Sequence, residues 1–191
     1  MLSQVLLFLL ETFLGLFALA LLLRFHMQWL RAPIRNPISQ FLNALTDWAV
    51  IPARRLIPGF GGLDWATLLL AWLIELVLIV ATFWLRGFSF VGSIGVDVIL
   101  VGFLALIQIF KLSLYILMFA VVLQAILSWV SPYSPAAPLL NSLARPFLRV
   151  FQKRIPPVGN VDLSPLFVVV ICQILLMAAG WLEGSVVRGI G

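Results

Sequence analysis

The sequence predicts an all-α integral membrane protein with four transmembrane helices, built as two parallel hairpin repeats that each carry a cytoplasmic amphipathic helix and a basic turn. The first observation is composition: 63% of the 191 residues are hydrophobic and 10% are charged, whereas soluble chains are about 45–50% apolar and roughly 25% charged. The second is an internal duplication at a constant offset of 98 residues. In it, Arg55, Ile57, Pro58, Gly61 and Asp64 correspond to Lys153, Ile155, Pro156, Gly159 and Asp162.

The first apolar segment, Leu2 to Leu23, is long enough to cross a hydrocarbon layer of about 30 Å as a helix. It lacks the basic n-region and the small-x-small cleavage site of a signal peptide, and it carries Glu11, so we expect a retained first span. The basic residues follow this segment, beginning with Arg24. Because positive residues favour the cytoplasmic side, the N-terminus is expected outside.

A shorter amphipathic segment follows a loop that contains prolines and arginines. Apolar residues recur at helical spacing from Ile38 to Ala49, and polar residues including Ser39 and Thr46 lie on the other face. The segment is too short to span a membrane. We therefore expect an amphipathic helix in the cytoplasmic interface, ended by Pro52 just before the basic turn.

Two further apolar segments come next. The second span is expected from Leu63 to Leu85, with Asp64 capping its first turn. Residues 96–130 contain Lys111 near the middle, and no glycine or proline next to it to make a turn. We expect one continuous helix here, which spans from about Leu112 to Val130, while its earlier part extends, tilts or bends along the interface.

The second copy repeats this order. An amphipathic stripe runs from Leu139 to Phe151, with a kink expected at Pro146. After the second turn, Asp162 and Pro165 make a good helix start for a last span, Leu166 to Val187. We assign residues 1–86 to the first repeat, 87–110 to a linker and an extension of the third helix, and 111–191 to the second repeat.

Charge sets the relative orientation of the repeats. The two long loops are strongly basic. Before the aspartates of the turns, Asp64 and Asp162, the first loop contains one acidic residue, Asp47, and the second contains none. The cations of the two loops are Arg24, Arg31, Arg35, Arg54, Arg55, Arg145, Arg149, Lys153 and Arg154. Four spans place both loops in the cytoplasm and both termini outside. Five spans would invert the repeats and leave one basic loop outside, against the charge bias.

The turns supply the first group of candidate site residues, for binding a partner or lipid. They are Arg54, Arg55, Pro58, Gly61, Gly62, Asp64, Lys153, Arg154, Pro156, Gly159 and Asp162. In one interpretation the basic side chains fix topology and touch anionic lipid, at about 1 kcal/mol each. In the other, proline and glycine hold each turn rigid, and the two turns form a bivalent docking surface.

Four polar residues inside the expected spans form the second group: Glu75, Gln173, Glu11 and Lys111. Glu75 and Gln173 are counterparts in the two repeats. They either make hydrogen bonds that hold the bundle together, or Glu75 is a functional intramembrane carboxylate. Glu11 and Lys111 are also counterparts, and either they pair across the pseudo-two-fold axis or Lys111 extends to the outer interface.

Several classes of function are disfavoured. Cys172 is the single cysteine and His26 the single histidine, so the sequence indicates no intramolecular disulfide and no multi-histidine metal centre. The glycines of the turn are not followed by Gly-Lys-Ser/Thr, which argues against a P-loop. Without a nucleophile, base and orienting group at workable spacing, we expect no enzyme, cofactor or metal site. The net charge of +5 is too small and too segregated to indicate a nucleic-acid partner.

A family resemblance rests on Trp29, Asn36-Pro37, the run from Arg54 to Pro58, the run from Gly61 to Asp64, and their second copies. These features resemble the bacterial YggT family, which includes the YlmG proteins and plastid homologues. The resemblance implies associations with cell division and envelope organisation, assembly of a plastid cytochrome complex, osmotic stress and potassium handling. The second copy departs from the motif, with Gln152 for the first arginine and Asn160 for the second glycine, so it is expected to bind a shared partner more weakly.

These features together predict a non-catalytic scaffold or assembly factor in the bacterial plasma (inner) membrane. It would dock a cytoplasmic or membrane partner through its two basic Ile-Pro turns. The alternative is an oligomeric channel or channel modulator for ion homeostasis. The expected partners are anionic lipid headgroups and either another protein or further copies of this chain.

Overall fold

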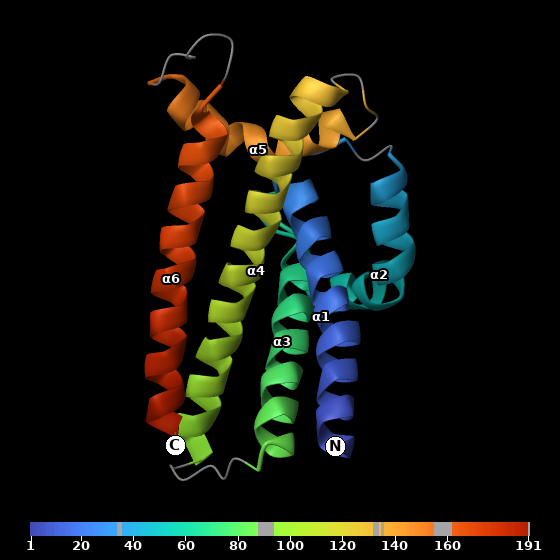
Figure 1. Cartoon of the computed structure of the whole chain (residues 1–191). Helices are drawn as coiled ribbons and strands as arrows, with labels where there is room; N and C mark the ends of the chain where they lie inside the picture. Colours follow the sequence, from blue (N-terminus) through green and yellow to red (C-terminus); the bar gives the residue numbers. More distant parts are fainter. Residues whose placement is uncertain (34–35, 88–93, 132–133, 135, 155–161, 191) are drawn as a thin grey trace.

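The computed structural model describes residues 1–33, 36–87, 94–131, 134, 136–154 and 162–190. Within these ranges it contains six helices and no strand: α1 (Leu2–Trp29), α2 (Pro37–Leu56), α3 (Trp65–Leu85), α4 (Ile94–Val130), α5 (Ala137–Gln152) and α6 (Ser164–Ile190) (Figure 1). The all-α prediction is therefore confirmed.

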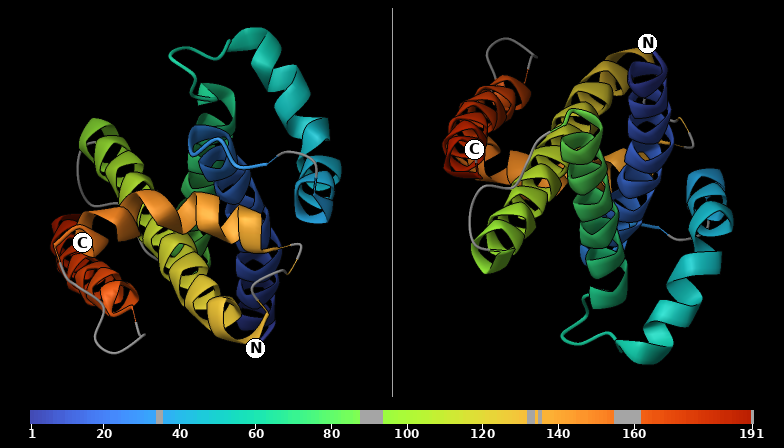
Figure 2. Two further views of the ribbon diagram at one scale, coloured as in Figure 1. Left: turned by 90° about the horizontal axis from the view of Figure 1, so that it is seen from above. Right: turned by 90° about the horizontal axis from the view of Figure 1, so that it is seen from below.

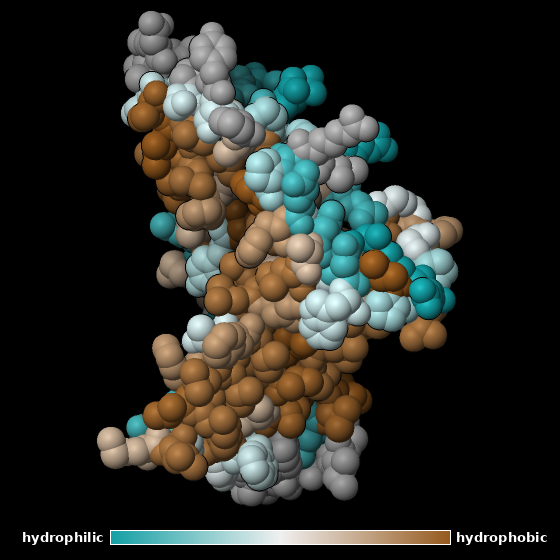
Figure 3. Space-filling view, turned by 90° about the vertical axis from the view of Figure 1, so that its right-hand side faces the viewer, coloured by the Kyte–Doolittle hydropathy of each residue, from teal (hydrophilic) through white to brown (hydrophobic). Residues whose placement is uncertain are grey.

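Four helices, α1, α3, α4 and α6, are long and apolar enough to cross a membrane. They present large apolar side chains to the outside, for example Phe8, Phe119 and Met177, which are 66%, 66% and 76% exposed. Figure 3 shows a broad apolar surface on one side of the molecule. Water-soluble proteins rarely expose apolar surface on this scale, so these features indicate a multi-pass membrane protein.

The four long helices form one bundle. α1 packs mainly on α3, and α4 packs mainly on α6, while α3 and α4 join the two pairs. α5 lies across one end of the bundle and contacts α4, α6 and α1 (Figures 1 and 2). α2 runs down the outside of the bundle against α1 and α3, and both chain termini lie at the end opposite α5 (Figure 1).

The side of α2 that packs on the bundle contains both polar and apolar residues, since Ser39, Leu42, Thr46 and Val50 are buried. Ser39 and Thr46, on its polar face, are 3% and 0% exposed, because this face packs toward the bundle. Phe41 and Trp48, in its apolar stripe, are 66% and 72% exposed. The stripe therefore faces the surroundings, as suits a helix at a lipid interface.

Several helix boundaries differ from the sequence-based expectation. α1 continues past Leu23 to Trp29. The expectation that Pro52 ends the amphipathic helix is wrong, since α2 continues to Leu56. Its last turn stays closed because the Ile57 N–H donates to the Ala53 carbonyl at 2.9 Å. Residues 96–130 do lie within one continuous helix, and Pro146 lies inside α5 as expected.

Candidate functional sites: a basic turn and two polar cavities

The turn between α2 and α3 has a defined backbone. Gly61 and Gly62 adopt φ values of 67° and 79°, in the left-handed region that glycine enters at little cost. The Leu63 N–H donates to the Phe60 carbonyl at 3.2 Å, and the Trp65 indole N–H donates to the same carbonyl, also at 3.2 Å. The two glycines therefore permit the compact backbone of this turn.

Arg54 and Asp64 join the two ends of this turn. Arg54 donates to Asp64 Oδ2 from Nε at 3.1 Å and from an Nη at 2.5 Å. Asp64 is 2% exposed and caps α3, accepting from the Thr67 N–H at 3.4 Å and from the Thr67 hydroxyl. Burial raises the pKa of Asp64. The hydrogen bonds and charge of Arg54 and the hydrogen bonds of Thr67 lower it by more, so the pKa of Asp64 lies below its ordinary value.

In the second turn, the positions that correspond to Arg54 and Asp64 are also in contact, but the first of them is a neutral glutamine. Gln152, the counterpart of Arg54, donates to Asp162 Oδ2 at 2.7 Å, and the Ser164 N–H donates to Asp162 Oδ1 at 2.8 Å. Burial raises the pKa of Asp162, yet these hydrogen bonds bring it below its ordinary value. Of the other residues predicted for this turn, Lys153 and Arg154 are described, and Pro156 and Gly159 lie outside the described residues.

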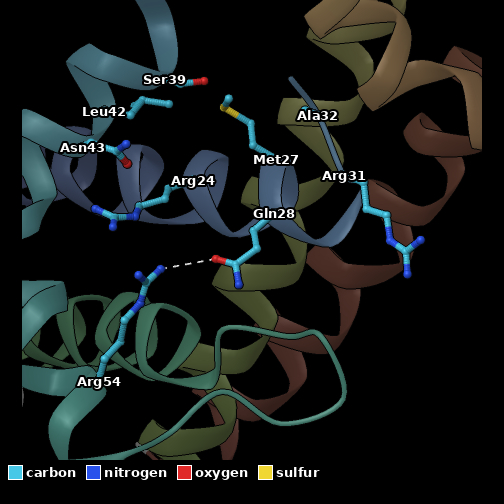
Figure 4. A pocket seen from close by; sticks show the side chains of 9 residues that line it. All are labelled: Arg24, Met27, Gln28, Arg31, Ala32, Ser39, Leu42, Asn43 and Arg54. Carbon is cyan, nitrogen blue, oxygen red and sulfur yellow. Dashed lines mark hydrogen bonds between the residues drawn. The ribbon is translucent and has the colours of Figure 1, made fainter. Parts of the chain in front are cut away.

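The basic cavity is a space of about 470 Å³ between the end of α1, the start of α2 and Arg54. Its polar lining includes Arg24, Gln28, Asn43 and Arg54 (Figure 4). Arg54 donates to Gln28 Oε1 at 3.2 Å. Arg24, whose side chain is 10% exposed, donates from Nη1 to Asp47 Oδ1 at 2.7 Å and to Thr46 Oγ1 at 2.6 Å.

On the sequence alone, Arg24 serves only to set orientation, and Gln28 has no assigned role. Arg24 lies on α1 and Asp47 on α2, so the spacing of residues within one helix cannot predict their contact. The duplication does indicate that position 24 joins the two helices. Gln124, the counterpart of Arg24, donates to Asn141 Oδ1 at 3.4 Å, so in both copies the first long helix is joined to the amphipathic helix at this position.

The acidic cavity, of about 380 Å³, lies toward the other end of the bundle, with Glu11, Glu75, Gln108 and Glu183 in its lining. Glu75 is 6% exposed and makes no hydrogen bond within the described part of the chain. The proposed hydrogen bonds at Glu75 and Gln173 are therefore not formed there, since the Gln173 side chain is exposed and likewise unbonded.

Lys111 is paired, but with a residue other than Glu11. Its Nζ lies 2.7 Å from Glu183 Oε2, and Gln108 Nε2 donates to Glu183 Oε1 at 2.8 Å. The hypothesis of a Glu11–Lys111 pair is therefore wrong, because α4 packs on α6 and brings Glu183 within reach of the ammonium group. Among the described residues, no group of three or more His, Cys, Asp or Glu side chains could hold a metal ion.

Comparison with known proteins gives a consistent result over most of the chain. The profile described as CCB3/YggT matches residues 3–85 and 103–182, one segment in each repeat. The uncharacterized protein PA0392 of Pseudomonas aeruginosa is 39% identical over 162 residues, which cover 84% of this chain and 80% of that protein. The uncharacterized protein YggT of Escherichia coli (strain K12) is 33% identical over 171 residues, or 89% and 86% of the two chains.

A third relative, an uncharacterized protein in the proC 3′ region of Vibrio alginolyticus, is 33% identical over 181 residues, or 94% of each chain. No solved structure matches the chain.

Proposed function

The chain belongs to the CCB3/YggT family, and from this premise we propose that it is a non-catalytic scaffold or assembly factor of the bacterial plasma (inner) membrane. In this proposal α1, α3, α4 and α6 cross the bilayer as two parallel hairpin repeats. The amphipathic helices and the basic turns lie on the cytoplasmic side, and both termini lie outside. This orientation keeps both basic loops in the cytoplasm.

Exposed cations at the ends of the two amphipathic helices carry the proposal. Arg55 lies in the last turn of α2, and Lys153 and Arg154 directly follow α5. All three are exposed, and no hydrogen bond or ion pair engages their side chains within the described residues. Arg54 differs because Asp64 already binds it. We therefore assign partner contact to Arg55, Lys153 and Arg154, which suit an acidic protein surface.

Site-specific crosslinking tests the docking role. A photoreactive residue at Leu56, which is 84% exposed, and another at Val150, which is 52% exposed, lie beside the two sets of cations. Mass spectrometry of the crosslinked products from intact cells is expected to identify the same protein from both positions. Because the cations provide the attraction, the R55Q/K153Q variant is expected to lose this product.

The matched control is R86Q/R188Q, which removes two arginines near the other end of the bundle. It is expected to keep the crosslinked product. If R55Q/K153Q captures the partner as well as the unmodified chain does, the docking proposal fails. Capture of only lipid, or of further copies of this chain, also contradicts it.

A second candidate function, ion handling by an oligomer, is favoured by the acidic cavity. Glu75 is a buried carboxylate without a hydrogen bond in the described structure, and intramembrane carboxylates commonly mark ion or proton paths. This function predicts cation flux through liposomes that contain the purified protein. The flux should be lost in E75Q and retained in Q173A, a change at the counterpart position. Absence of flux from the unmodified protein excludes this candidate.

A further inference from the structure

We propose that the basic cavity binds the phosphate group of one anionic phospholipid. The inference depends on the membrane placement in the proposed function, but it does not depend on protein docking. It concerns the space between the end of α1 and the first half of α2, where Arg24, Gln28 and Arg54 converge (Figure 4).

Unused hydrogen-bond donors are the first argument. Arg24 bonds Asp47 and Thr46 through Nη1 alone, so its Nε and Nη2 have no partner among the described residues. Arg54 bonds Asp64 and Gln28 through Nε and Nη2, which leaves Nη1. Guanidinium groups bind phosphate oxygens through paired N–H donors. The cavity thus keeps donors for an anion after its internal contacts are satisfied.

Charge is the second argument. No acidic side chain lines the cavity, and the two nearby carboxylates are already used: Asp47 faces Arg24 and Asp64 faces Arg54. Arg31 adds a third cation at the rim. Its side chain is exposed, has no partner in the described structure and points away from Gln28 (Figure 4). Among the described lining residues, Arg31 thus leaves one positive charge without an acidic partner, which matches the single negative charge of a phosphodiester.

The apolar part of the lining selects a lipid over a free anion. Buried Met27, Ala32 and Leu42 form one wall of the same space. The outer face of α2 exposes Phe41 and Trp48, as expected for a helix at headgroup depth. A phospholipid places its phosphate beside apolar glycerol and acyl carbons, whereas inorganic phosphate gains nothing from such a wall.

The second repeat lacks the three polar side chains that converge in the basic cavity. Arg24, Gln28 and Arg54 are replaced there by Gln124, Ser128 and Gln152. Gln152 makes the equivalent hydrogen bond to Asp162, whereas Gln124 bonds Asn141, the counterpart of Asn43 and not of Asp47 or Thr46. The contact at the turn therefore persists without an arginine, so a guanidinium at position 54 is not needed for that contact alone. One lipid per chain is expected.

Native mass spectrometry of the full chain in detergent tests the proposal. Phosphatidylglycerol and phosphatidylcholine with identical acyl chains are added separately. We expect one retained phosphatidylglycerol per chain and on the order of tenfold weaker binding of phosphatidylcholine. R24Q/R54Q gives both positions the side chain found in the second repeat, and circular dichroism checks that its fold persists. It should weaken phosphatidylglycerol binding by on the order of tenfold.

The matched control R86Q/R188Q removes the same number of charges near the other end of the bundle, and it should leave lipid binding unchanged. Equal binding of both lipids, or equal losses in the two double variants, overturns the proposal. Retention of inorganic phosphate at equal occupancy overturns the assignment to lipid. Protease protection in vesicles reports membrane insertion separately, so failure of the membrane placement is distinguishable from failure of the lipid site.

Discussion

At the scale of single residues, the contact between Arg54 and Asp64 has the clearest energetic consequence. A carboxylate that is 2% exposed needs hydrogen-bond donors, and Arg54 supplies two of them. Arg54→Ala is expected to lower the free energy of unfolding by about 1–3 kcal/mol, since it leaves the buried acceptor short of donors.

Arg54→Gln is the informative comparison, because Gln152 makes the equivalent bond to Asp162. We expect it to cost less than half as much as Arg54→Ala. Thermal or chaotrope unfolding of the purified protein in detergent measures both. Equal losses in the two variants would show that the hydrogen bond contributes nothing.

The lowered pKa of Asp64 predicts a dependence of stability on acid. A carboxylate whose pKa is lower in the folded than in the unfolded chain stabilises the fold above its unfolded pKa, and this contribution is lost as the pH falls through the folded pKa. The loss should begin near the ordinary value of 3.8 and continue below it. Asp64→Asn should show less stability than the unmodified chain at pH 7 and a smaller difference at pH 3; a constant difference contradicts the assignment.

Arg31 occupies a backbone position that favours glycine. Its φ is 51°, and it follows α1 in a Schellman motif, with Ala32 N–H to Met27 carbonyl at 2.8 Å and Arg31 N–H to Gln28 carbonyl at 3.2 Å. Arg31→Gly should therefore stabilise the fold by about 1 kcal/mol while weakening phosphatidylglycerol binding. Unfolding and native mass spectrometry measure the two effects, and a loss of stability would contradict the prediction.

At the scale of elements, α2 shows what the sequence pattern predicts and what it leaves open. Helical spacing correctly indicated an amphipathic helix, because spacing depends only on the 3.6-residue period. It did not indicate which face packs on the bundle. Burial of Thr46 depends on Arg24, which reaches it from another helix, and on the Leu42 carbonyl, to which its hydroxyl donates at 2.6 Å.

Spin labelling tests this orientation of α2. Cys172→Ala gives a background without cysteine, into which single cysteines are placed at Ser39, Phe41, Thr46 and Trp48. Labels at positions 41 and 48 should be mobile and accessible to oxygen from lipid, whereas those at 39 and 46 should be immobilised by packing. The reverse pattern in reconstituted membranes would contradict the described packing.

The candidate sites were predictable only in part, for a related reason. The duplication identified the turn and its glycines, because left-handed backbone restricts the residue type locally. It did not identify the basic cavity or the Lys111–Glu183 pair. Those depend on which helices become neighbours, and neither α1 beside α2 nor α4 beside α6 follows from the apolar pattern of a single span.

At the scale of the whole molecule, the carboxyl group of Glu75 inside the bundle has an expected effect on stability. Glu75 is buried with no hydrogen bond in the described structure, so Glu75→Gln is expected to raise the free energy of unfolding by roughly 1–3 kcal/mol. Glu11→Gln, at an exposed position of the same cavity, should have little effect. Unfolding in detergent measures both, and a destabilised E75Q would show that the carboxylate is satisfied.

The placement of both termini at the same end of the bundle has a consequence for how such a chain arises (Figure 1). A repeat whose first and last residues lie at the same end of the bundle can be joined to a second copy by a short loop. No additional helix is needed, and both copies keep the same orientation. Tandem duplication of the gene for a two-helix ancestor thus yields a working product in one step. Each copy is afterwards free to diverge, and the difference between Arg24 and Arg54 in the first copy and Gln124 and Gln152 in the second is the kind of specialisation that follows.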